Sequence, residues 1–425
     1  MHMEDMSFEE DWEVIESLLP EGWQEKCKEL KAYQLKRAFD GAGKLLKTIL
    51  IHCAQGHSFR TTAVLAEEGG LATLSDVALN KRLRLGSDWL RWMSEGVVQK
   101  WLSPSNSRDC AATIRVKVAD ASTVQEHGSK GTSWRIHYAL ELSSLQCNQI
   151  SITGKETGES FKNFTVQEGD VWMGDRAYAK PPGIAHVLAH GGDVLARMGW
   201  NSLQLCDEKG KKFDLLWHLR QLRLHEVGDW PVFIAHDKGL IAGRICALRK
   251  SVSAANRERK RILKESSKKG RNTKAQTLEA AGYTFVFTTL DQSISAETIL
   301  TIYRIRWQIE LTFKRLKSLL GLGHLHNKNP ESAKAWLYGK LLAACLIEAL
   351  AVVSERFFPW GYPLGTTTPL MEKHLEGDRP YVSLLLTSHN ARKQPGLTTQ
   401  TVENIVQETR GATSKTPDEN GRTAS

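Results

Sequence analysis

The sequence lacks the features that mark secreted and membrane-spanning proteins. Its seven cysteines are scattered and odd in number, and no C-x-x-C pair occurs, which argues against a disulfide framework or a zinc cluster. Residues 1–12 are acidic and contain no apolar core, so no secretory signal is expected. The longest apolar run, residues 341–353, contains Glu348 and is too short to cross a bilayer, so we expect a buried helix there. These absences favour a reducing, cytoplasmic compartment.

Positive charge, in contrast, is in excess. The 425 residues include 57 Lys and Arg against 48 Asp and Glu, which gives a net charge of +9. Such a balance favours a polyanionic partner, either nucleic acid or an anionic membrane surface, although many basic proteins bind neither. No amphipathic membrane anchor is recognisable in the sequence, so no membrane partner is expected. The length and the 41% hydrophobic content suffice for two or three domains with their own cores.

The N-terminal region, residues 1–108, has a helical pattern. Helices are expected at 58–68 and 75–85, joined by a glycine turn, and the second helix begins at Ser75 and ends with the basic residues Lys81 and Arg82. This outline fits a helix-turn-helix that binds DNA through these two side chains. It fits equally well an ordinary helical hairpin with a solvated face, and the sequence does not decide between the two.

The centre of the chain alternates apolar and polar residues in the way that strands do. Within residues 109–205, strands are expected at 114–118, 134–142 and 150–152, followed by a short apolar strand at 171–174. A helix is expected at 184–190 and another strand at 193–198. The strand at 134–142 is expected to be half buried. Strands are also expected at 204–206, 232–235, 241–248 and 283–290. This order predicts an α/β core of mixed strand directions, residues 109–205 and 286–330, interrupted by residues 206–285.

A run of Lys and Arg at 257–274 lies within that interruption. Such a run is most often a solvated helix or a flexible loop. If it lay beside DNA, Lys260, Arg261 and their neighbours would instead bind backbone phosphates.

The most informative pattern lies on a helix expected from Ser295 to about residue 320. Tyr303, Arg306, Glu310 and Lys317 follow the spacing Y-x2-R-x3-E-x6-K. Because a helix turns about 100° per residue, these four side chains are expected to form one axial stripe. A carboxylate flanked by two cations and a phenol suits a metal ion beside a phosphate. The alternative is an i,i+4 Arg–Glu pair with a solvated Lys, which would contribute little to stability.

Two aspartates, Asp120 and Asp175, are each expected to end an apolar strand. A carboxylate in such a setting is costly unless a metal, a cation or a hydrogen-bond donor faces it. If the two strands are neighbours, both aspartates emerge at one edge of the sheet, and Glu310 can supply a third ligand. Strand-end aspartates also cap turns, which is the alternative for each one alone. Three converging carboxylates suit two Mg²⁺ ions that cleave a phosphodiester.

With these residues the chain resembles the bacterial insertion-sequence transposases that carry an Asp-Asp-Glu triad and the Y-x2-R-x3-E-x6-K signature. The resemblance covers roughly residues 110–325, including V-A-D-A-S around Asp120, G-D-R-A-Y around Asp175 and W-R-I-H at 134–137. It implies an RNase H-like fold split by a β-rich insertion, and a catalytic triad of Asp120, Asp175 and Glu310 that binds two Mg²⁺ or Mn²⁺ ions. In the family, water attacks each transposon end, and the freed 3′-hydroxyl then attacks target DNA.

The resemblance also implies the partners. Double-stranded DNA is expected, as transposon ends and as target, on a homodimer in the bacterial cytoplasm at the nucleoid. DNA would be held by Tyr303, Arg306, Lys317 and Arg176 near the cut. The helical region 331–395 is expected to serve dimerisation, and residues 396–425 are expected to form a disordered tail. The alternatives are a metal-dependent nuclease that does not join DNA and an inactive DNA-binding derivative.

Close relatives pass through a DNA hairpin and stack a flipped base on an aromatic side chain of the insertion. No tryptophan directly precedes the helix that carries Glu310. Tyr283, Phe285 and Phe287 are the possible substitutes, although alternation at these positions is more typical of core residues.

Overall fold

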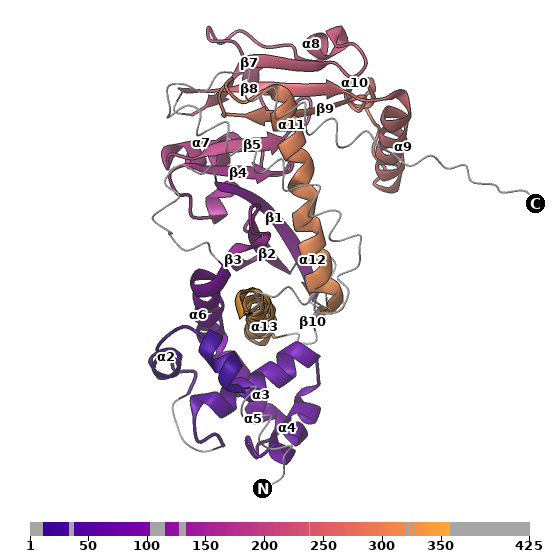
Figure 1. Cartoon of the computed structure of the whole chain (residues 1–425). Coiled ribbons are helices and arrows are strands. Elements are labelled where there is room, and N and C mark those ends of the chain that lie inside the picture. The colour runs from indigo at the N-terminus through magenta and orange to yellow at the C-terminus, as the bar shows by residue number, and fades with distance from the viewer. Residues whose placement is uncertain are drawn as a thin grey trace, which may run out of the picture.

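A mixed β-sheet runs through the molecule, and a layer of helices closes one end of it (Figure 1). The computed structural model describes residues 12–33, 38–102, 115–126, 133–237, 239–319, 321, 324–325 and 329–357. The strands are β1 Arg115–Glu126, β2 Trp134–Glu141, β3 Gln146–Gly154, β4 Asp170–Gly174, β5 Asp193–Arg197, β6 Leu205–Cys206, β7 Val227–His236, β8 Gly239–Arg249, β9 Tyr283–Thr288 and β10 His324–Leu325.

The strand order within the described residues is β3-β2-β1-β4-β5-β9-β8-β7-β6, and β10 pairs with the far end of β1. Strands β1, β2 and β3 are antiparallel neighbours, whereas β4 and β5 run parallel to β1. This confirms the RNase H-like α/β core that was predicted. Apolar side chains pack on both faces of the sheet, with the even-numbered residues of β1 facing one core and Ala119 facing the other.

The insertion lengthens the sheet of the core. Strand β9 pairs with β5 on one side and with β8 on the other, so that β8, β7 and β6 continue the same sheet outward. Three helices accompany these strands: α8 Leu215–Gln221, α9 Val252–Lys268 and α10 Ala275–Ala280. The basic run is therefore largely a helix, α9, whose first turn is capped by Ser251 accepting a hydrogen bond from the Ala254 amide.

The helical layer contains α2 Trp23–Glu29, α3 Ala42–Gln55, α4 Phe59–Glu68, α5 Asp76–Leu85, α6 Ser87–Val97, the π-helical turn η1 Val98–Leu102, and α13 Pro330–Phe357. Helices α4 and α5 confirm the predicted pair, and Ser75 caps α5 by accepting from the Ala78 amide. Helix α13 packs against α3, α5 and α6, so the two ends of the described chain share one helical layer (Figure 1).

Helix α13 corrects one estimate of length. The apolar stretch spans Pro330–Val353 and is long enough to cross a membrane by length and composition, whereas the prediction confined it to residues 341–353. The underestimate arose because the first half is built from Ala, Gly, Trp and Tyr, with Lys334 and Lys340 interrupting the run. Most of this stretch is buried within the fold, as predicted. The tail at 396–425, and the region 331–395 beyond residue 357, lie outside the described residues.

Three further expectations were wrong in detail. Strand β1 does not end at Asp120 but continues to Glu126, because β2 pairs with it as far as Val124 and β10 pairs with it beyond. Strand β2 is buried on both faces over most of its length, because it lies between β1 and β3 under a core on each side. The long helix is divided into α11 Ala296–Arg304, a 3₁₀ turn η3 Ile305–Trp307, and α12 Gln308–Leu319.

Candidate active site

Asp120 lies on β1, and Asp175 directly follows the neighbouring strand β4 at the matching position. The parallel pairing of β1 with β4 ends at Val118 opposite Met173, and each aspartate comes two residues later. Side chains two residues apart on a strand point to the same face, so the Asp120 carboxylate projects, like Val118, to the face covered by α11 and α12. The charge of Asp175 acts on the Tyr303 hydroxyl of α11. Asp120 is thus a mid-strand residue placed where β1 and β4 separate, and Asp175 follows the end of β4 as predicted.

The turn after β4 fixes the Asp175 side chain. Its Oδ1 accepts a hydrogen bond of 2.8 Å from the Ala177 amide, and the Asp120 Oδ1 accepts one of 2.8 Å from the Ala121 amide. Gly174 leaves no room for a side chain, because an added Cβ would lie 2.6 Å from the Tyr178 Cβ. The sequence Gly174-Asp175 therefore lets the chain turn tightly against Tyr178 and present the carboxylate.

Helix α12 is anchored over this part of the sheet by its apolar side. Ile309, Phe313 and Leu316 are buried, and the Phe313 ring meets the Tyr138 ring of β2 edge-on at 5.8 Å between centroids. Tyr138 is the partner of Asp120 across the β1–β2 ladder, so Phe313 brings α12 alongside Asp120. Figure 1 shows α11 and α12 crossing the sheet as a nearly continuous rod.

A shallow cleft lies between β1 and α12. Its lining combines the first aspartate with the acidic and basic residues of the signature: Asp120, Ala121, Ser122, Glu310, Phe313, Lys314 and Lys317. The structure therefore brings Asp120, Glu310 and Lys317 to one surface, as the sequence predicts.

The four residues of the signature are not equally accessible. Tyr303 is buried, Arg306 is half buried, and Glu310 and Lys317 are exposed. Arg306 donates a charge-assisted hydrogen bond to Glu310, so the i,i+4 pair is present. The Tyr303 hydroxyl is buried beside the Arg306 guanidinium, without a hydrogen bond of standard geometry to any protein group. The 3₁₀ turn between Tyr303 and Glu310 means that these side chains do not follow one ideal helical stripe.

The carboxylates are not gathered into a chelating set. Among the residues that the structure describes, no group of three or more His, Cys, Asp or Glu side chains is arranged to hold a metal ion. The Glu310 carboxylate is turned toward Arg306. The Glu310 side chain is 59% exposed, so solvent leaves it room to turn away from Arg306 toward Asp120.

Electrostatics at the aspartates favour a cation. Burial raises the pKa of Asp120 to about 6; the Ala121 amide opposes this rise, and the charge of Asp175 adds to it. The ionised form of Asp120 is thus destabilised in the folded chain. Carboxylate oxygens are the ligands that hard divalent cations prefer, and a cation between Asp120 and Asp175 would relieve their repulsion. The donor set therefore fits Mg²⁺ or Mn²⁺.

A basic cluster lies beside Asp175 and Tyr303. It consists of Arg176, Arg197, Lys250 and Arg261, gathered around the Glu258 carboxylate. Arg261 contacts Glu258 at 2.6 Å, Arg197 lies 3.9 Å from it, and burial together with Arg197 lowers the pKa of Lys250 to about 8. Burial also lowers the pKa of Arg176, and the charges of Arg197 and Arg261 add to this effect. The cluster joins the end of β5 to α9 next to the candidate site.

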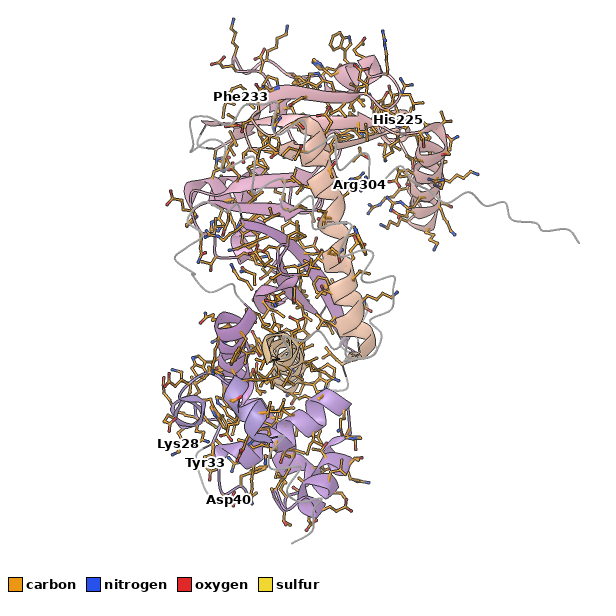
Figure 2. The ribbon with its side chains drawn as sticks, in the orientation of Figure 1. Lys28, Tyr33, Asp40, His225, Phe233 and Arg304 are labelled. Atoms are coloured by element: carbon orange, nitrogen blue, oxygen red, sulfur yellow. The ribbon has the colours of Figure 1, made fainter. Side chains whose placement is uncertain are left out.

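The remaining predicted DNA-binding residues are distributed over the surface. Lys260 is exposed on α9, one residue from Arg261. Lys81 is exposed and Arg82 is partly exposed on α5, in the helical layer and away from the catalytic residues. Figure 2 shows how far this layer lies from the insertion: Lys28, Tyr33 and Asp40 mark one end of the molecule, and His225 and Phe233 mark the other.

Sequence reasoning missed four residues near the site: Glu159, Tyr178, Arg197 and Lys250. Arg197 could have been indicated only by the alternation of side chains along β5. Leu195, two residues earlier, is buried on the face covered by α11 and α12, and residues two apart on a strand share a face. Tyr178 belongs to the G-D-R-A-Y motif around Asp175, which places it near that aspartate. For Glu159 and Lys250, no local pattern in the sequence signals proximity to the site. The aromatic candidates of the insertion fall into two groups, since Phe285 and Phe287 are core residues and Tyr283 is partly buried.

Comparison with known proteins gives a consistent result. The family model described as "Transposase DDE domain" matches residues 118–346. The putative transposase InsL for insertion sequence element IS186A of Escherichia coli (strain K12) is 32% identical over 359 residues, covering 82% of this chain and 96% of the relative. The transposase for insertion sequence element IS421 of Escherichia coli is 32% identical over 360 residues, with the same coverage of each chain.

A more distant relative is the transposase for insertion sequence element IS231F of Bacillus thuringiensis subsp. israelensis. It is 23% identical over 373 residues, covering 79% of this chain and 78% of the relative. The matched region of the family model includes Asp120, Asp175 and the whole four-residue signature. The chain belongs to the DDE transposases of bacterial insertion sequences, and it is a nucleic-acid-processing enzyme of that family.

Proposed function

We propose that this transposase cleaves and joins DNA at one metal-dependent site formed by Asp120, Asp175 and Glu310. The observation that supports the proposal most directly is that Asp120 on β1 and Asp175 just after the adjacent strand β4 occupy matching positions, with Glu310 lining the same cleft as Asp120. Carboxylates next to a cation-rich surface suit phosphate chemistry better than a stabilising role, because burial and the charge of Asp175 make the ionised form of Asp120 costly.

In this proposal, two divalent ions held by the triad would lower the pKa of the attacking hydroxyl and neutralise charge on the scissile phosphate and leaving oxygen. The chain itself does the positioning. Asp120 and Asp175 are fixed by hydrogen bonds from the Ala121 and Ala177 amides. Glu310 leaves Arg306 to join them, which frees the Arg306 guanidinium to bind a phosphate oxygen. The buried Tyr303 hydroxyl beside Arg306 gains the same phosphate as a partner.

DNA would cross the face that carries the cleft and the basic cluster. Lys317 lines the cleft on one side of Glu310, and Arg176 with Arg261 lies on the other side near Tyr303. Together these side chains offer cations on both sides of the cut, as binding along a phosphate backbone requires. Lys260 would extend the contact along α9. Lys81 and Arg82 on α5 would meet a more distant part of the same DNA or a second duplex.

The cut-and-paste reaction requires two transposon ends, so the proposed acting form is a homodimer on double-stranded DNA. The first part of the predicted dimerisation region 331–395 is helix α13. Most of this helix is buried against the helical layer of its own chain. Any contact between protomers that uses this region must therefore involve the exposed residues of α13, such as Ile347, or segments beyond it. A hairpin intermediate gains no support from Phe285 and Phe287, because both are core residues.

The test is Glu310→Gln, with Glu297→Gln as the matched control. Both residues are exposed glutamates of the same rod, and both substitutions remove one negative charge without changing side-chain shape. We expect Glu310→Gln to abolish Mg²⁺-dependent cleavage of DNA that carries the ends of the element, while binding of that DNA persists. Glu297→Gln should cleave as the unsubstituted protein does. Cleavage retained by Glu310→Gln would refute the proposed triad.

A strand-transfer assay with pre-cut ends separates a transposase that joins from a nuclease that only cuts. The proposal requires joined products from pre-cut ends and their loss in Glu310→Gln, since the same site serves both steps. Cleavage with no joined product in either Mg²⁺ or Mn²⁺ would show that the protein is a nuclease and not a transposase that joins DNA.

A further inference from the structure

Most of the net positive charge of this chain lies in one short segment of the insertion. Residues 252–274, which are helix α9 and the residues that follow it, contain nine Lys and Arg against two Glu, a net charge of +7 where the whole chain carries +9. The proposed catalytic site uses Lys260 and Arg261 from this segment and leaves the other basic residues without a role. Charge concentrated in this way marks a surface for a polyanion when the side chains face one way.

Four exposed cations of α9 do face one way. A helix turns about 100° and rises about 1.5 Å per residue, so positions 257, 260, 264 and 268 lie within an arc of about 80° and over a length of about 17 Å. We call these four side chains the basic stripe: Arg257, Lys260, Lys264 and Lys268. All four are exposed, and within the described part of the chain none of them forms an ion pair. Arg261, in contrast, pairs with Glu258 and Glu265 at 2.6 and 2.9 Å.

The packing of α9 gives no reason for the basic stripe. Within this helix, which the structure describes from end to end, only Ala255 is buried. The side opposite the stripe fastens the helix, because the Arg259 guanidinium donates a 3.0 Å hydrogen bond to the Leu278 carbonyl there. Like charges three or four positions apart on a helix repel each other and destabilise it. The stripe therefore lowers the stability of the free protein, and a polyanion bound along it would remove that repulsion.

Helix α9 and the helical layer lie on opposite sides of the catalytic aspartates. The helical layer meets the sheet at β3, against which η1 and α13 pack, and the strand order from there is β3-β2-β1-β4-β5. At the other side, Glu258 of α9 lies 3.9 Å from Arg197, the last residue of β5. Because β4 and β5 are parallel, this end of β5 lies at the same edge of the sheet as Asp175, which follows β4. Figure 1 shows the same order, so a duplex that spans from the helical layer to α9 passes the aspartates.

We propose that the basic stripe binds the phosphate backbone of double-stranded DNA outside the element, beyond the cut as seen from the helical layer, whatever the sequence of that DNA. This inference rests on the proposed function, because the position of the cut defines which DNA is outside. Lysine and arginine contacts to phosphates carry no sequence information. They suit DNA outside the element, since its sequence differs from one insertion to the next. A stripe of about 17 Å spans about five phosphates of one strand, at about 3.4 Å of duplex axis each.

The test measures binding of the full chain to two DNAs by fluorescence anisotropy, over a range of salt concentrations and without divalent ions, so that no strand is cut. One DNA carries an element end with flanking duplex, and the other stops at the cut. The variant is Lys264→Gln with Lys268→Gln. The matched control is Lys209→Gln with Lys211→Gln, which removes the same charge from two exposed lysines in the loop after β6, at the outer edge of the sheet.

On the flanked DNA, we expect the α9 variant to bind about tenfold or more weakly at about 0.1 M salt, with a slope of log K against log salt that is smaller by about two, because each phosphate contact contributes about 0.9 to that slope. On the DNA that stops at the cut, the variant should bind as the unsubstituted protein does. The control should match the unsubstituted protein on both DNAs. Lys264→Arg with Lys268→Arg should bind the flanked DNA normally, because the contact depends on charge. An unrelated flank sequence should give the same results.

Several results would overturn the inference. Equal losses on both DNAs would place the stripe on the element itself, a loss with one flank sequence only would mean that it reads bases, and no loss on either DNA would leave α9 a solvated helix. Unchanged DNA binding with weaker binding to phosphatidylglycerol vesicles would assign the stripe to a membrane surface. The proposed triad is tested separately: if Glu310→Gln still cleaves, the triad fails, whereas a loss of binding that depends on the flank would still support the role of α9.

Discussion

Replacing Asp120 by Asn should make the protein more stable at neutral pH while it removes a catalytic carboxylate. Burial raises the pKa of Asp120 from 3.8 to about 6, with a further contribution from Asp175. The ionised carboxylate is therefore less favourable in the folded chain than in the unfolded chain. Asn has nearly the same shape, and its Oδ1 can still accept the 2.8 Å hydrogen bond from the Ala121 amide.

The size of the effect follows from the pKa. Each unit of pKa corresponds to about 1.4 kcal/mol, so the rise from 3.8 to about 6 costs the folded state up to about 3 kcal/mol at pH 7. The folded protein holds this proton more tightly than the unfolded one. Stability therefore falls as the pH rises from about 4 to about 6, and it stays at the lower value above pH 6. Asn has no such titration.

Urea unfolding of the two proteins, followed by circular dichroism from pH 4 to pH 8 without divalent ions, measures the difference. We expect Asp120→Asn to be more stable by about 2–3 kcal/mol above pH 6, and the difference should vanish near pH 4. Added Mg²⁺ should stabilise the unsubstituted protein more than the variant, because binding to the folded state raises its stability. A variant that is equally or less stable at pH 7 would refute the claim that the site stores electrostatic strain at Asp120.

Two other substitutions test separate parts of the structure. Asp170→Asn should lower the free energy of unfolding, measured by urea denaturation, by about 3 kcal/mol, because the buried Lys117 ammonium loses the carboxylate that lies 2.8 Å from it. A loss below about 1 kcal/mol would contradict this. Arg261→Gln should weaken binding to end DNA and reduce the slope of log K against log salt by about one, while Arg223→Gln, an exposed arginine of the insertion outside the basic cluster, should change neither; equal slopes for all three proteins would exclude Arg261 as a phosphate contact.

Sequence patterning located the elements well, because alternation and capping are local properties. The strand β4 ending before Asp175, the pair α4 and α5 with Ser75 at its cap, and the buried helix at residues 341–353 all follow from neighbours along the chain. The sequence could not define where β1 ends. That strand continues past Asp120 because β2 and β10 form backbone hydrogen bonds with it there. Which strands lie beside a segment depends on the whole sheet, so the sequence of the segment alone does not reveal where the strand ends.

The candidate site was predictable to the extent that it depends on a spaced signature. Glu310 and Lys317 line one cleft with Asp120. The spacing of the signature predicts only that Glu310 and Lys317 share a side of their helix, and the approach to Asp120 depends on the order of the strands. The 3₁₀ turn between Tyr303 and Glu310 was not predictable, because residues 305–307 carry no helix-breaking residue. The position of Glu159 was not predictable either, because its segment is brought to the turn after Asp175 by tertiary contacts: Phe161 packs on Tyr178, and Lys180 donates a hydrogen bond to the Glu159 carbonyl.

The central claim is that Asp120, Asp175 and Glu310 hold divalent ions together. Anomalous diffraction at the manganese edge, from crystals of the protein with end DNA soaked in Mn²⁺, tests it most directly. The account predicts anomalous peaks between the two aspartates, with the Glu310 carboxylate turned away from Arg306 toward them. Bound end DNA with no manganese among these three side chains, or with manganese held elsewhere, would contradict it.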